Sequence, residues 1–266
     1  MFLLSFYLMD KIVEQLVKSR VGLKPLLVGV SGCQGSGKTT LTNRAAQDLN
    51  DQGIATIAIS IDDFYLPHAD QVKLAARGNP LWQKRGLFAS HDVESMIKVL
   101  QDLKSGCDTV VPIYDKSQFN GQGDRVGLRR VTGKYQAILI EGWCLGFHSI
   151  GKPAIEKALE GPGFPATKLY KLADLAEIDD AMHAYEPVWS ALDLTVYLRP
   201  EQLDFVYSWR LQQEHDLRSK LGTGMSDDEV KQFVDQYMPA YELYKDTVKF
   251  DLSFLLHFDR SFERLN

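Results

Sequence analysis

The chain has 266 residues, of which 45% are hydrophobic and 24% charged, a composition typical of globular proteins with room for one large domain or two small ones. The formal net charge of −5 argues against a general nucleic-acid-binding protein, because such proteins normally carry a basic excess. Three cysteines, at positions 33, 107 and 144, follow neither a disulfide nor a zinc-binding spacing, so we expect a reducing compartment, the cytoplasm.

The N-terminal segment 1–9 is apolar but far too short to span a bilayer. It has no basic region and no small-residue cleavage site, so we predict neither a signal peptide nor contact with a membrane. Residues 10–20 place Ile12, Val13, Leu16 and Val17 on one face of a predicted helix. We expect this helix to pack in front of the first strand.

The segment 32–39 reads Gly-Cys-Gln-Gly-Ser-Gly-Lys-Thr, the spacing of a phosphate-binding loop. An apolar run over 26–30 precedes it and a helical pattern over 40–49 follows, so the loop lies between a buried strand and a helix. Its backbone N–H groups and the helix N-terminus suit phosphate. Lys38 supplies charge for the outer phosphates, and the Thr39 hydroxyl suits Mg²⁺. The residues predicted to contact the nucleotide are Gly32, Cys33, Gln34, Gly35, Ser36, Gly37, Lys38, Thr39 and Thr40.

Strand and helix patterns alternate along the rest of the chain. The predicted strands cover 55–61, 109–113, 137–140, 193–198 and 252–258, and a helix follows the N-cap candidate Asp92. Alternation of this kind predicts a parallel sheet covered by helices on both faces. Asp62, Asp63 and Glu141 then fall at the carboxyl ends of strands, beside the phosphate loop, where such sheets bind their ligands.

Two later segments differ from this pattern. The Gly- and Pro-rich segment 151–164 is predicted to be a loop or an insertion. Residues 201–244 contain two helical patterns around a glycine-rich turn, which is typical of a lid that closes over phosphates. Arg210 is the basic residue that we expect to act from this lid; Arg218 and Lys220 fit a lid and a solvated helix face equally well.

Several motifs resemble those of the uridine kinase, phosphoribulokinase and pantothenate kinase group, and more finely those of plant-type D-glycerate 3-kinases and their fungal relatives. The resemblance implies an α/β P-loop fold in which 1–266 is a single kinase domain, with an N-terminal helix (1–25) and a helical lid (201–244). The matching segments are the phosphate loop, 61–65 (IDDFY), 85–86 (RG), 90–92 (SHD), 112–117 (PIYDKS), 120–125 (NGQGDR), 140–147 (IEGWCLGF), 209–212 (WRLQ), 224–230 (GMSDDEV) and 237–241 (YMPAY).

The resemblance implies transfer of the γ-phosphoryl group of MgATP to a hydroxyl of a small molecule, with D-glycerate as the leading acceptor. Asp62 then accepts the hydroxyl proton or helps to hold Mg²⁺, Asp63 being the rival for this role, and Glu141 assists the metal. Two alternatives remain: a kinase for a nucleoside or a pantothenate-like acceptor, and a nucleotide-binding module that hydrolyses ATP slowly. The oligomeric state does not follow from the sequence.

The acceptor site is expected among residues of the matching motifs. Arg125 is the first choice to bind an acceptor carboxylate and Lys116 the second, because a small anionic acceptor needs a cation. His91 and Tyr114 fit packing roles equally well. Cys33, near a lysine and a helix N-terminus, suggests a reactive thiol; an inert buried thiol is the alternative. The predicted acceptor-binding residues are Asp63, Tyr65, Arg85, His91, Tyr114, Asp115, Lys116 and Arg125.

Overall fold

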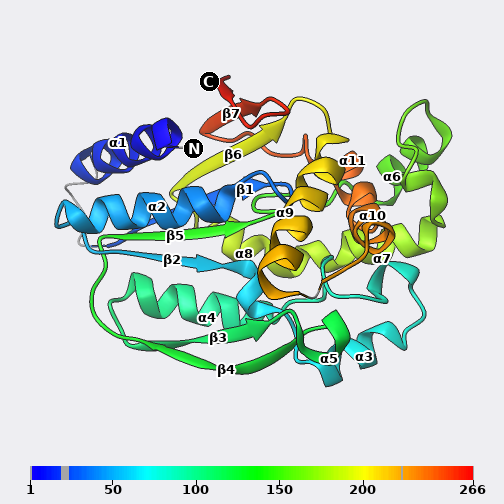
Figure 1. Ribbon diagram of the computed structural model, residues 1–266, viewed down its shortest axis with the longest axis horizontal. Coiled ribbons are helices and arrows are strands. Elements are labelled where there is room, and N and C mark those ends of the chain that lie inside the picture. The colour runs from blue at the N-terminus through cyan, green and yellow to red at the C-terminus, as the bar shows by residue number, and fades with distance from the viewer. Residues whose placement is uncertain (1, 19–23, 223, 266) are drawn as a thin grey trace.

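The computed structural model describes residues 2–18, 24–222 and 224–265. Its main sheet has six strands in the order β2-β5-β1-β6-β7-β8 (Figure 1). Neighbouring strands from β2 to β7 pair in parallel, and the short β8 pairs antiparallel with β7 at one edge. The predicted parallel sheet is therefore confirmed, with one addition: the chain after β7 turns back at once, and such a tight return allows only antiparallel pairing. The strands are Leu26–Gly32 (β1), Thr56–Ser60 (β2), Ala137–Gly142 (β5), Leu194–Pro200 (β6), Leu252–Leu256 (β7) and Phe262–Arg264 (β8).

Helices flank the sheet. The helix after the phosphate loop, α2, packs against α1, β2 and β5, and α4 packs against α8 (Figure 1). None of the helices in the described ranges is long and apolar enough to cross a membrane. The helices before the lid are Phe2–Lys18 (α1), Lys38–Asp51 (α2), His68–Ala75 (α3), Val93–Lys104 (α4), Gln118–Gly121 (α5), Lys152–Glu160 (α6), Leu172–Ala181 (α7) and Glu186–Trp189 (α8), with 3₁₀ turns at Ile61–Phe64 (η1), Pro80–Trp82 (η2), Thr167–Leu169 (η3) and Met182–Tyr185 (η4).

The strand predicted over 109–113 belongs to a second, two-stranded antiparallel sheet, formed by Thr109–Asp115 (β3) and Asp124–Val131 (β4). Val111 and Val131 are buried, whereas Leu128 is exposed. This ribbon therefore buries one face only, and its polar second strand has no apolar run that would predict it. A register shift between Ile113 and Tyr114 turns the end of β3, which carries Lys116 toward η1.

The lid segment forms Phe205–Leu221 (α9), Asp227–Asp235 (α10) and Met238–Tyr244 (α11). Ser226 and Glu229 cap the start of α10 with a reciprocal capping box. The segment 151–164, predicted to be a loop or an insertion, contains the helix α6, so the loop alternative was wrong. Pro153 lies in the first turn of α6, where proline starts a helix instead of breaking it.

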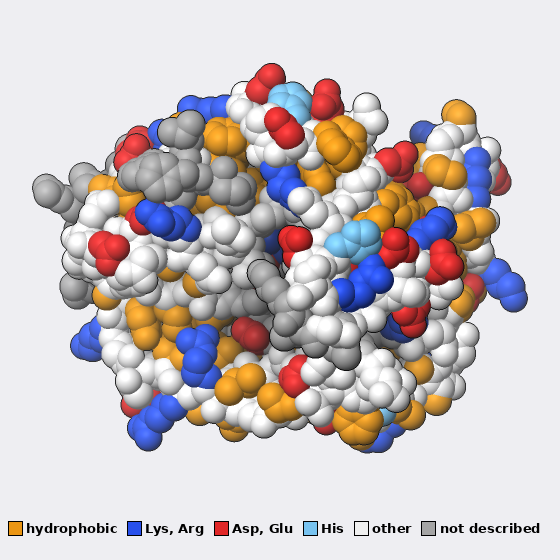
Figure 2. Space-filling model, in the orientation of Figure 1, with side chains coloured by type: hydrophobic (Ala, Val, Ile, Leu, Met, Phe, Trp, Pro, Cys, Tyr) orange, Lys and Arg blue, Asp and Glu red, His pale blue; other side chains and the backbone are white. Residues whose placement is uncertain are grey.

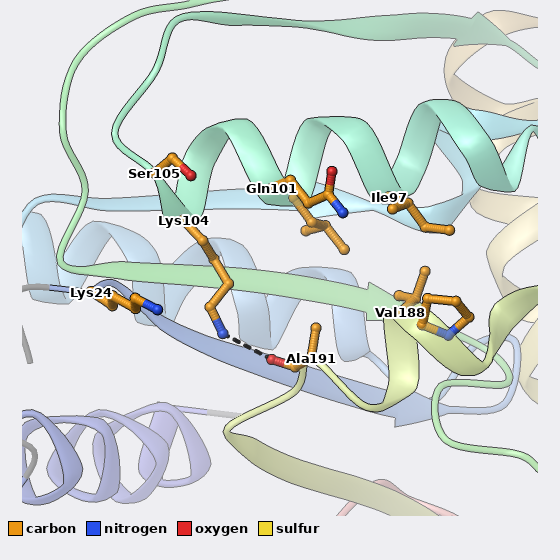
Figure 3. Close-up of a pocket in the computed structure, with 9 residues that line it drawn as sticks. Lys24, Ile97, Gln101, Lys104, Ser105, Val188 and Ala191 are labelled. Atoms are coloured by element: carbon orange, nitrogen blue, oxygen red, sulfur yellow. Dashed lines mark hydrogen bonds between the residues drawn. The ribbon is translucent and has the colours of Figure 1, made fainter.

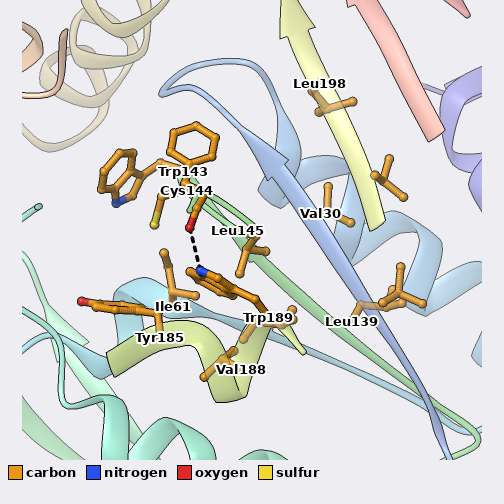
Figure 4. Close-up of a cluster of buried hydrophobic side chains, with 14 of the residues drawn as sticks. Val30, Ile61, Leu139, Trp143, Cys144, Leu145, Tyr185, Val188, Trp189 and Leu198 are labelled. Atoms are coloured by element: carbon orange, nitrogen blue, oxygen red, sulfur yellow. Dashed lines mark hydrogen bonds between the residues drawn. The ribbon is translucent and has the colours of Figure 1, made fainter. Parts of the chain in front are cut away.

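An aromatic cluster supports the carboxyl ends of the central strands. Trp143, which directly follows β5, makes edge-to-face contacts with Tyr237 and Tyr241, at ring-centroid distances of 5.1 and 5.7 Å. Trp189 donates its indole N–H to the Phe147 carbonyl at 3.0 Å. Figure 4 shows Trp143, Tyr185 and Trp189 gathered beside the ends of these strands. Rings packed in this way fix the backbone that follows β5, on which the site depends.

Candidate active site

The phosphate loop joins β1 to α2. Gly37 precedes α2 with φ of 89° and Gly35 has φ of 76°, both in the left-handed region that favours glycine. A Cβ on Gly35 would also lie only 2.6 Å from the Trp209 Cβ. The first turn of α2 therefore begins at the loop, where its N–H groups lack helical partners and can bind an anion. Thr40 is exposed in this turn.

Two donors converge inside the loop on the Cys33 carbonyl. Lys38 Nζ lies 3.5 Å and the Ser36 backbone nitrogen 3.2 Å from this oxygen. Both distances are longer than the roughly 2.9–3.0 Å that is commonest for such bonds, so these donors can exchange the carbonyl for a phosphate oxygen at small cost. Gln34, at the loop's outer side, accepts a hydrogen bond from the Tyr241 hydroxyl at 2.7 Å.

Thr39, in the first turn of α2, meets Glu141 because β1, which leads into the phosphate loop, is in register with β5. Val30 pairs with Glu141 across β1 and β5, which places the carboxylate beside the loop. Thr39 Oγ1 donates to Glu141 Oε1 at 2.8 Å. Glu141 is buried, and its Oε2 has no hydrogen-bond partner among the described residues. A buried carboxylate oxygen without a partner is costly, and a hard cation such as Mg²⁺ would satisfy it.

Asp62 lies in η1, directly after β2. Its Oδ2 is 2.5 Å from Lys116 Nζ, which comes from the end of β3. Burial acts to raise the pKa of Asp62, but the charge and hydrogen bond of Lys116, together with the charge of Lys38, outweigh burial and hold this pKa well below its usual range. Asp62 is therefore ionised and close to the phosphate-loop lysine.

Asp63 differs from its neighbour. Burial raises the pKa of Asp63, and the nearby carboxylates of Asp62 and Glu141 raise it further. A backbone hydrogen bond at Ser60 and the charge of Arg129 offset this rise of the pKa only in part. The structure thus brings Asp62, Asp63 and Glu141 together, and of the two aspartates the paired, ionised one is Asp62.

A wall of aromatic side chains lies next to Asp62. The His91 ring stacks on Tyr65 with centroids 4.4 Å apart, and its Nδ1 lies 2.8 Å from the Tyr185 hydroxyl. Burial lowers the pKa of His91 to about 4, despite the charge of Asp62, so the ring is neutral at physiological pH. Its Nε2 is buried and has no partner in the described chain. Tyr114 accepts a hydrogen bond from Gln71 Nε2 at 2.6 Å.

The two arginines predicted at the acceptor site, Arg85 and Arg125, differ in how many of their nitrogens donate hydrogen bonds to the protein. Arg125 donates to the backbone carbonyls of Tyr65 and Phe64 at 2.9 and 3.3 Å and pairs with Asp92 at 3.0 Å. All three of its nitrogens are engaged, so these contacts give it a role in holding η1 against α4. Among the residues that the structure describes, Arg85 donates only from Nη1, to the carbonyls of Gly121 and Gln122, each at 2.6 Å.

Two other predicted residues, Asp115 and Cys33, have surroundings that bear on their roles. Asp115 accepts hydrogen bonds from Ser117 N at 2.9 Å and Gln118 Nε2 at 2.7 Å, so it stabilises a local turn. Cys33 is buried, and burial raises the pKa of its thiol to about 12 against the opposing charge of Lys38. Burial therefore favours the alternative, an inert buried thiol, over a reactive Cys33, because the opposing charge of Lys38 does not compensate for desolvation.

In the lid, Arg210 pairs with the buried Glu214 at 2.6 Å. Glu214 Oε1 also accepts the Met225 backbone N–H at 2.7 Å, so one carboxylate joins α9 to the turn before α10. Arg218 pairs with Asp227 on the surface, which favours the solvated-face interpretation for this residue. The Lys220 side chain lies outside the described part of the structure.

One residue near the phosphate loop was not predicted. Arg260, in the turn between β7 and β8, donates from Nε to the Gly35 carbonyl at 2.9 Å. No motif marks it, because this contact joins positions 225 residues apart. The Trp209 indole N–H bonds to the Phe258 carbonyl at 2.7 Å in the same turn.

Away from this site, the structure has a pocket of about 250 Å³ between α4 and α8 (Figure 3). Lys24 and Lys104 line it together with apolar residues, and Lys104 donates to the Ala191 carbonyl at 3.0 Å. Lys24 precedes β1, so the pocket lies at the opposite end of this strand from the phosphate loop, roughly 20 Å away. Figure 2 shows acidic and basic side chains interspersed over the face of the molecule that is turned toward the viewer.

Comparisons with known proteins agree with this geometry. No protein-family model matches the chain. It is 36% identical over 250 residues to the "Uncharacterized kinase mug58" of Schizosaccharomyces pombe, covering 91% of this chain and 89% of that protein. It is 35% identical to the chloroplastic D-glycerate 3-kinase of Arabidopsis thaliana, over 84% of this chain and 48% of that longer protein.

A solved structure shows the same fold. The D-glycerate 3-kinase of Cryptococcus neoformans superimposes with a TM-score of 0.91 and 34% identity, over 97% of each chain. The match covers nearly the whole of both chains, so it concerns the fold as a whole and not one segment of it. The chain therefore belongs to the family of P-loop kinases that comprises the plant-type D-glycerate 3-kinases and their fungal relatives.

Proposed function

We propose that this kinase transfers the γ-phosphoryl group of ATP to a hydroxyl group of D-glycerate. The observation that carries the proposal is the position of Asp62, an ionised carboxylate that lies near Lys38 of the phosphate loop and is paired with Lys116 of the second sheet. Such a carboxylate is suited to accept the proton of a hydroxyl that attacks the terminal phosphate. The two homologues named D-glycerate 3-kinase support the choice of acceptor.

The nucleotide phosphates are proposed to bind at the N-terminus of α2. Lys38 Nζ and the Ser36 N–H, which now share the Cys33 carbonyl, would turn to phosphate oxygens. Lys38 would then stabilise the charge that moves onto the bridging oxygen during transfer. Arg210 is proposed to assist from the lid, but only with its partner Glu214, because separating this buried pair is costly.

The oxygens of Thr39, Glu141 and Asp62 would suit Mg²⁺, a hard cation that prefers oxygen ligands. The unpartnered Glu141 Oε2 is the feature of this structure that fits the ion best. When bound, Mg²⁺ neutralises charge on the β- and γ-phosphates. Thr39, Glu141 and Asp62 would orient it beside the loop.

We propose Arg85, with Lys116, as the cation for the acceptor carboxylate in place of Arg125. Burial raises the pKa values of Tyr65, Tyr114 and Tyr237, and the charge of Arg85 acts against this rise. The guanidinium group of Arg85 therefore lies close to these three side chains. Its Nη2 and Nε have no hydrogen-bond partner among the described residues. These two nitrogens form a fork that can bind a carboxylate in two places.

The function is tested by ADP release with D-glycerate, L-glycerate, glycerol, uridine and pantothenate as acceptors, followed by identification of the phosphorylated product. We expect turnover of D-glycerate well above the rate without acceptor. Turnover of uridine or pantothenate but not of D-glycerate would replace the acceptor and keep the kinase. An ADP-release rate that no acceptor increases would favour a nucleotide-hydrolysing module.

Arg85 is tested with a matched control. Arg85→Ala should raise the KM for D-glycerate about tenfold or more, the effect of losing a charge-assisted hydrogen bond, and leave the KM for ATP unchanged. Lys84→Ala removes the same charge from the neighbouring, exposed position and should change neither constant. If instead Arg125→Lys raises the KM for D-glycerate selectively and Arg85→Ala does not, Arg125 is the carboxylate ligand.

A further inference from the structure

The C-terminal turn between β7 and β8 reaches the phosphate loop. Four residues, 257–260, form this turn. Two backbone hydrogen bonds close it: His257 N donates to the Ser261 carbonyl at 3.0 Å, and Arg260 N donates to the His257 carbonyl at 2.9 Å. In Figure 1 β7 lies beside β6, whose end leads into α9. The chain's last hairpin is thereby brought to the loop and the lid helix at once.

Arg260 adopts an unusual backbone conformation at this point. Its φ of 62° lies in the left-handed region, which costs conformational energy for any residue with a Cβ. Such a conformation persists only where surrounding contacts determine it, and it is common at functional sites. Here it directs the side chain toward the phosphate loop.

Three contacts fix the Arg260 guanidinium. Nε donates to the Gly35 carbonyl at 2.9 Å, and Nη1 donates to Gln212 Oε1 at 2.9 Å. The Cζ atom lies 5.4 Å from the centre of the Trp209 ring. Both Gln212 and Trp209 belong to α9, so Arg260 contacts the loop and the lid helix with one rigid, planar group.

The contact with Gly35 orients the next peptide group. In a planar trans peptide the carbonyl of Gly35 and the N–H of Ser36 point in opposite directions. With the carbonyl turned outward to Arg260, the Ser36 N–H faces the inside of the loop, where it donates to the Cys33 carbonyl at 3.2 Å. This is the direction that a phosphate oxygen requires. The Trp209 Cβ closes the other side of Gly35.

We infer that Arg260 is a positioning residue for nucleotide binding: it holds the Gly35–Ser36 peptide with its N–H toward the phosphates and adds a positive charge behind the loop. The charge reaches the loop, because it acts on the Cys33 thiol. Arg260 itself need not contact ATP. The inference depends on the phosphate loop alone and not on the identity of the acceptor.

The test compares three variants. Arg260→Ala should raise the dissociation constant of MgATP, measured by calorimetry, about tenfold, the effect of losing a hydrogen bond from a charged donor. Arg260→Lys keeps the charge but cannot bond Gly35 and Gln212 together, so its constant should lie between those of Arg260→Ala and the wild type. Arg264→Ala removes the same charge from the same hairpin, where Arg264 lies 5.0 Å from the Tyr7 ring, and should leave MgATP binding unchanged.

A second readout separates positioning from general stability. The KM for the acceptor and the melting temperature of the nucleotide-free protein should change no more in Arg260→Ala than in Arg264→Ala. An unchanged MgATP constant in Arg260→Ala would overturn the inference. So would an equal weakening in Arg264→Ala, or a rise in the acceptor KM as large as the loss of MgATP affinity. If Arg260→Ala does not fold, the intermediate constant of Arg260→Lys decides the question.

Discussion

Replacement of Lys116 by methionine tests whether Asp62 is the base. The change keeps the length of the side chain and removes the charge that lies 2.5 Å from Asp62 Oδ2. Without Lys116, burial is opposed mainly by the charge of Lys38, so the pKa of Asp62 must rise. A cation this close lowers a carboxyl pKa by about 1–3 units. Because the Lys116 side chain is 56% exposed and solvent screens its charge, we expect the lower limit, about one unit.

The direction in which Lys116→Met changes activity follows from the protonation state of Asp62, because only the ionised carboxylate can accept a proton. In the wild type the depressed pKa keeps Asp62 ionised as the pH falls, so the acidic limb of the kcat profile lies at low pH. In Lys116→Met that limb should move upward by about one pH unit. The stability that the ion pair contributes is small, about 0–1 kcal/mol for a pair this exposed, and it is present above the unfolded-state pKa and lost as the pH falls through the folded-state value.

The assay measures kcat from ADP release at saturating MgATP and acceptor, from about pH 8 down to the lowest pH at which circular dichroism shows the protein still folded, because the limb set by a depressed carboxyl pKa lies at low pH. Lys73→Met is the matched control, because Lys73 pairs with Asp70 at 2.7 Å on the surface of α3. Its profile should superimpose on that of the wild type. The reasoning is refuted if the profile of Lys116→Met also superimposes, or if the control shifts as far.

Three further outcomes are expected. Lys38→Ala should lower kcat on the order of 10²–10³-fold while the circular dichroism spectrum is unchanged, since it removes charge stabilisation of the transition state; near-normal turnover would contradict the role of the loop. Glu141→Gln should require about 10–100-fold more Mg²⁺ for half-maximal activity, measured by metal titration, and an unchanged requirement would place the ion elsewhere. Iodoacetamide should modify the exposed Cys107 far faster than the buried Cys33, as read by peptide mass spectrometry with and without MgATP; rapid Cys33 labelling that MgATP prevents would contradict the raised pKa of its thiol.

The parts of the fold that local pattern determines were predictable from the sequence. The strand before the phosphate loop is an apolar run, and the loop's glycines, lysine and threonine have fixed spacing, so β1, the loop and α2 followed directly. β4 did not, because it is largely exposed and its register depends on pairing with β3. Pro153 lies in a segment rich in glycine and proline, residues that usually end helices. Nothing in the local sequence showed that this proline is in the first turn of a helix.

The site was predictable in residue type more than in role. Asp62 and Glu141 lie at strand ends because a parallel sheet brings such ends together. The contacts that distinguish Arg125 from Arg85 are to distant backbone carbonyls, and Cys33 is distinguished by its burial. Neither property has a local pattern in the sequence. Arg260 belongs to no motif, since its partner Gly35 is set by the path of the whole chain.

The buried carboxylate of Glu214 has a mechanical consequence for the lid. It bonds both Arg210 and the backbone of Met225, so a rotation of the arginine alone toward a phosphate would strand a negative charge in the protein interior, at a cost of about 3–5 kcal/mol. Rotation of its side chain alone is thus an unfavourable way for Arg210 to reach a phosphate. We expect α9 and the start of α10 to move together as one rigid unit. Amide hydrogen exchange should then show both segments gaining protection together when MgATP binds.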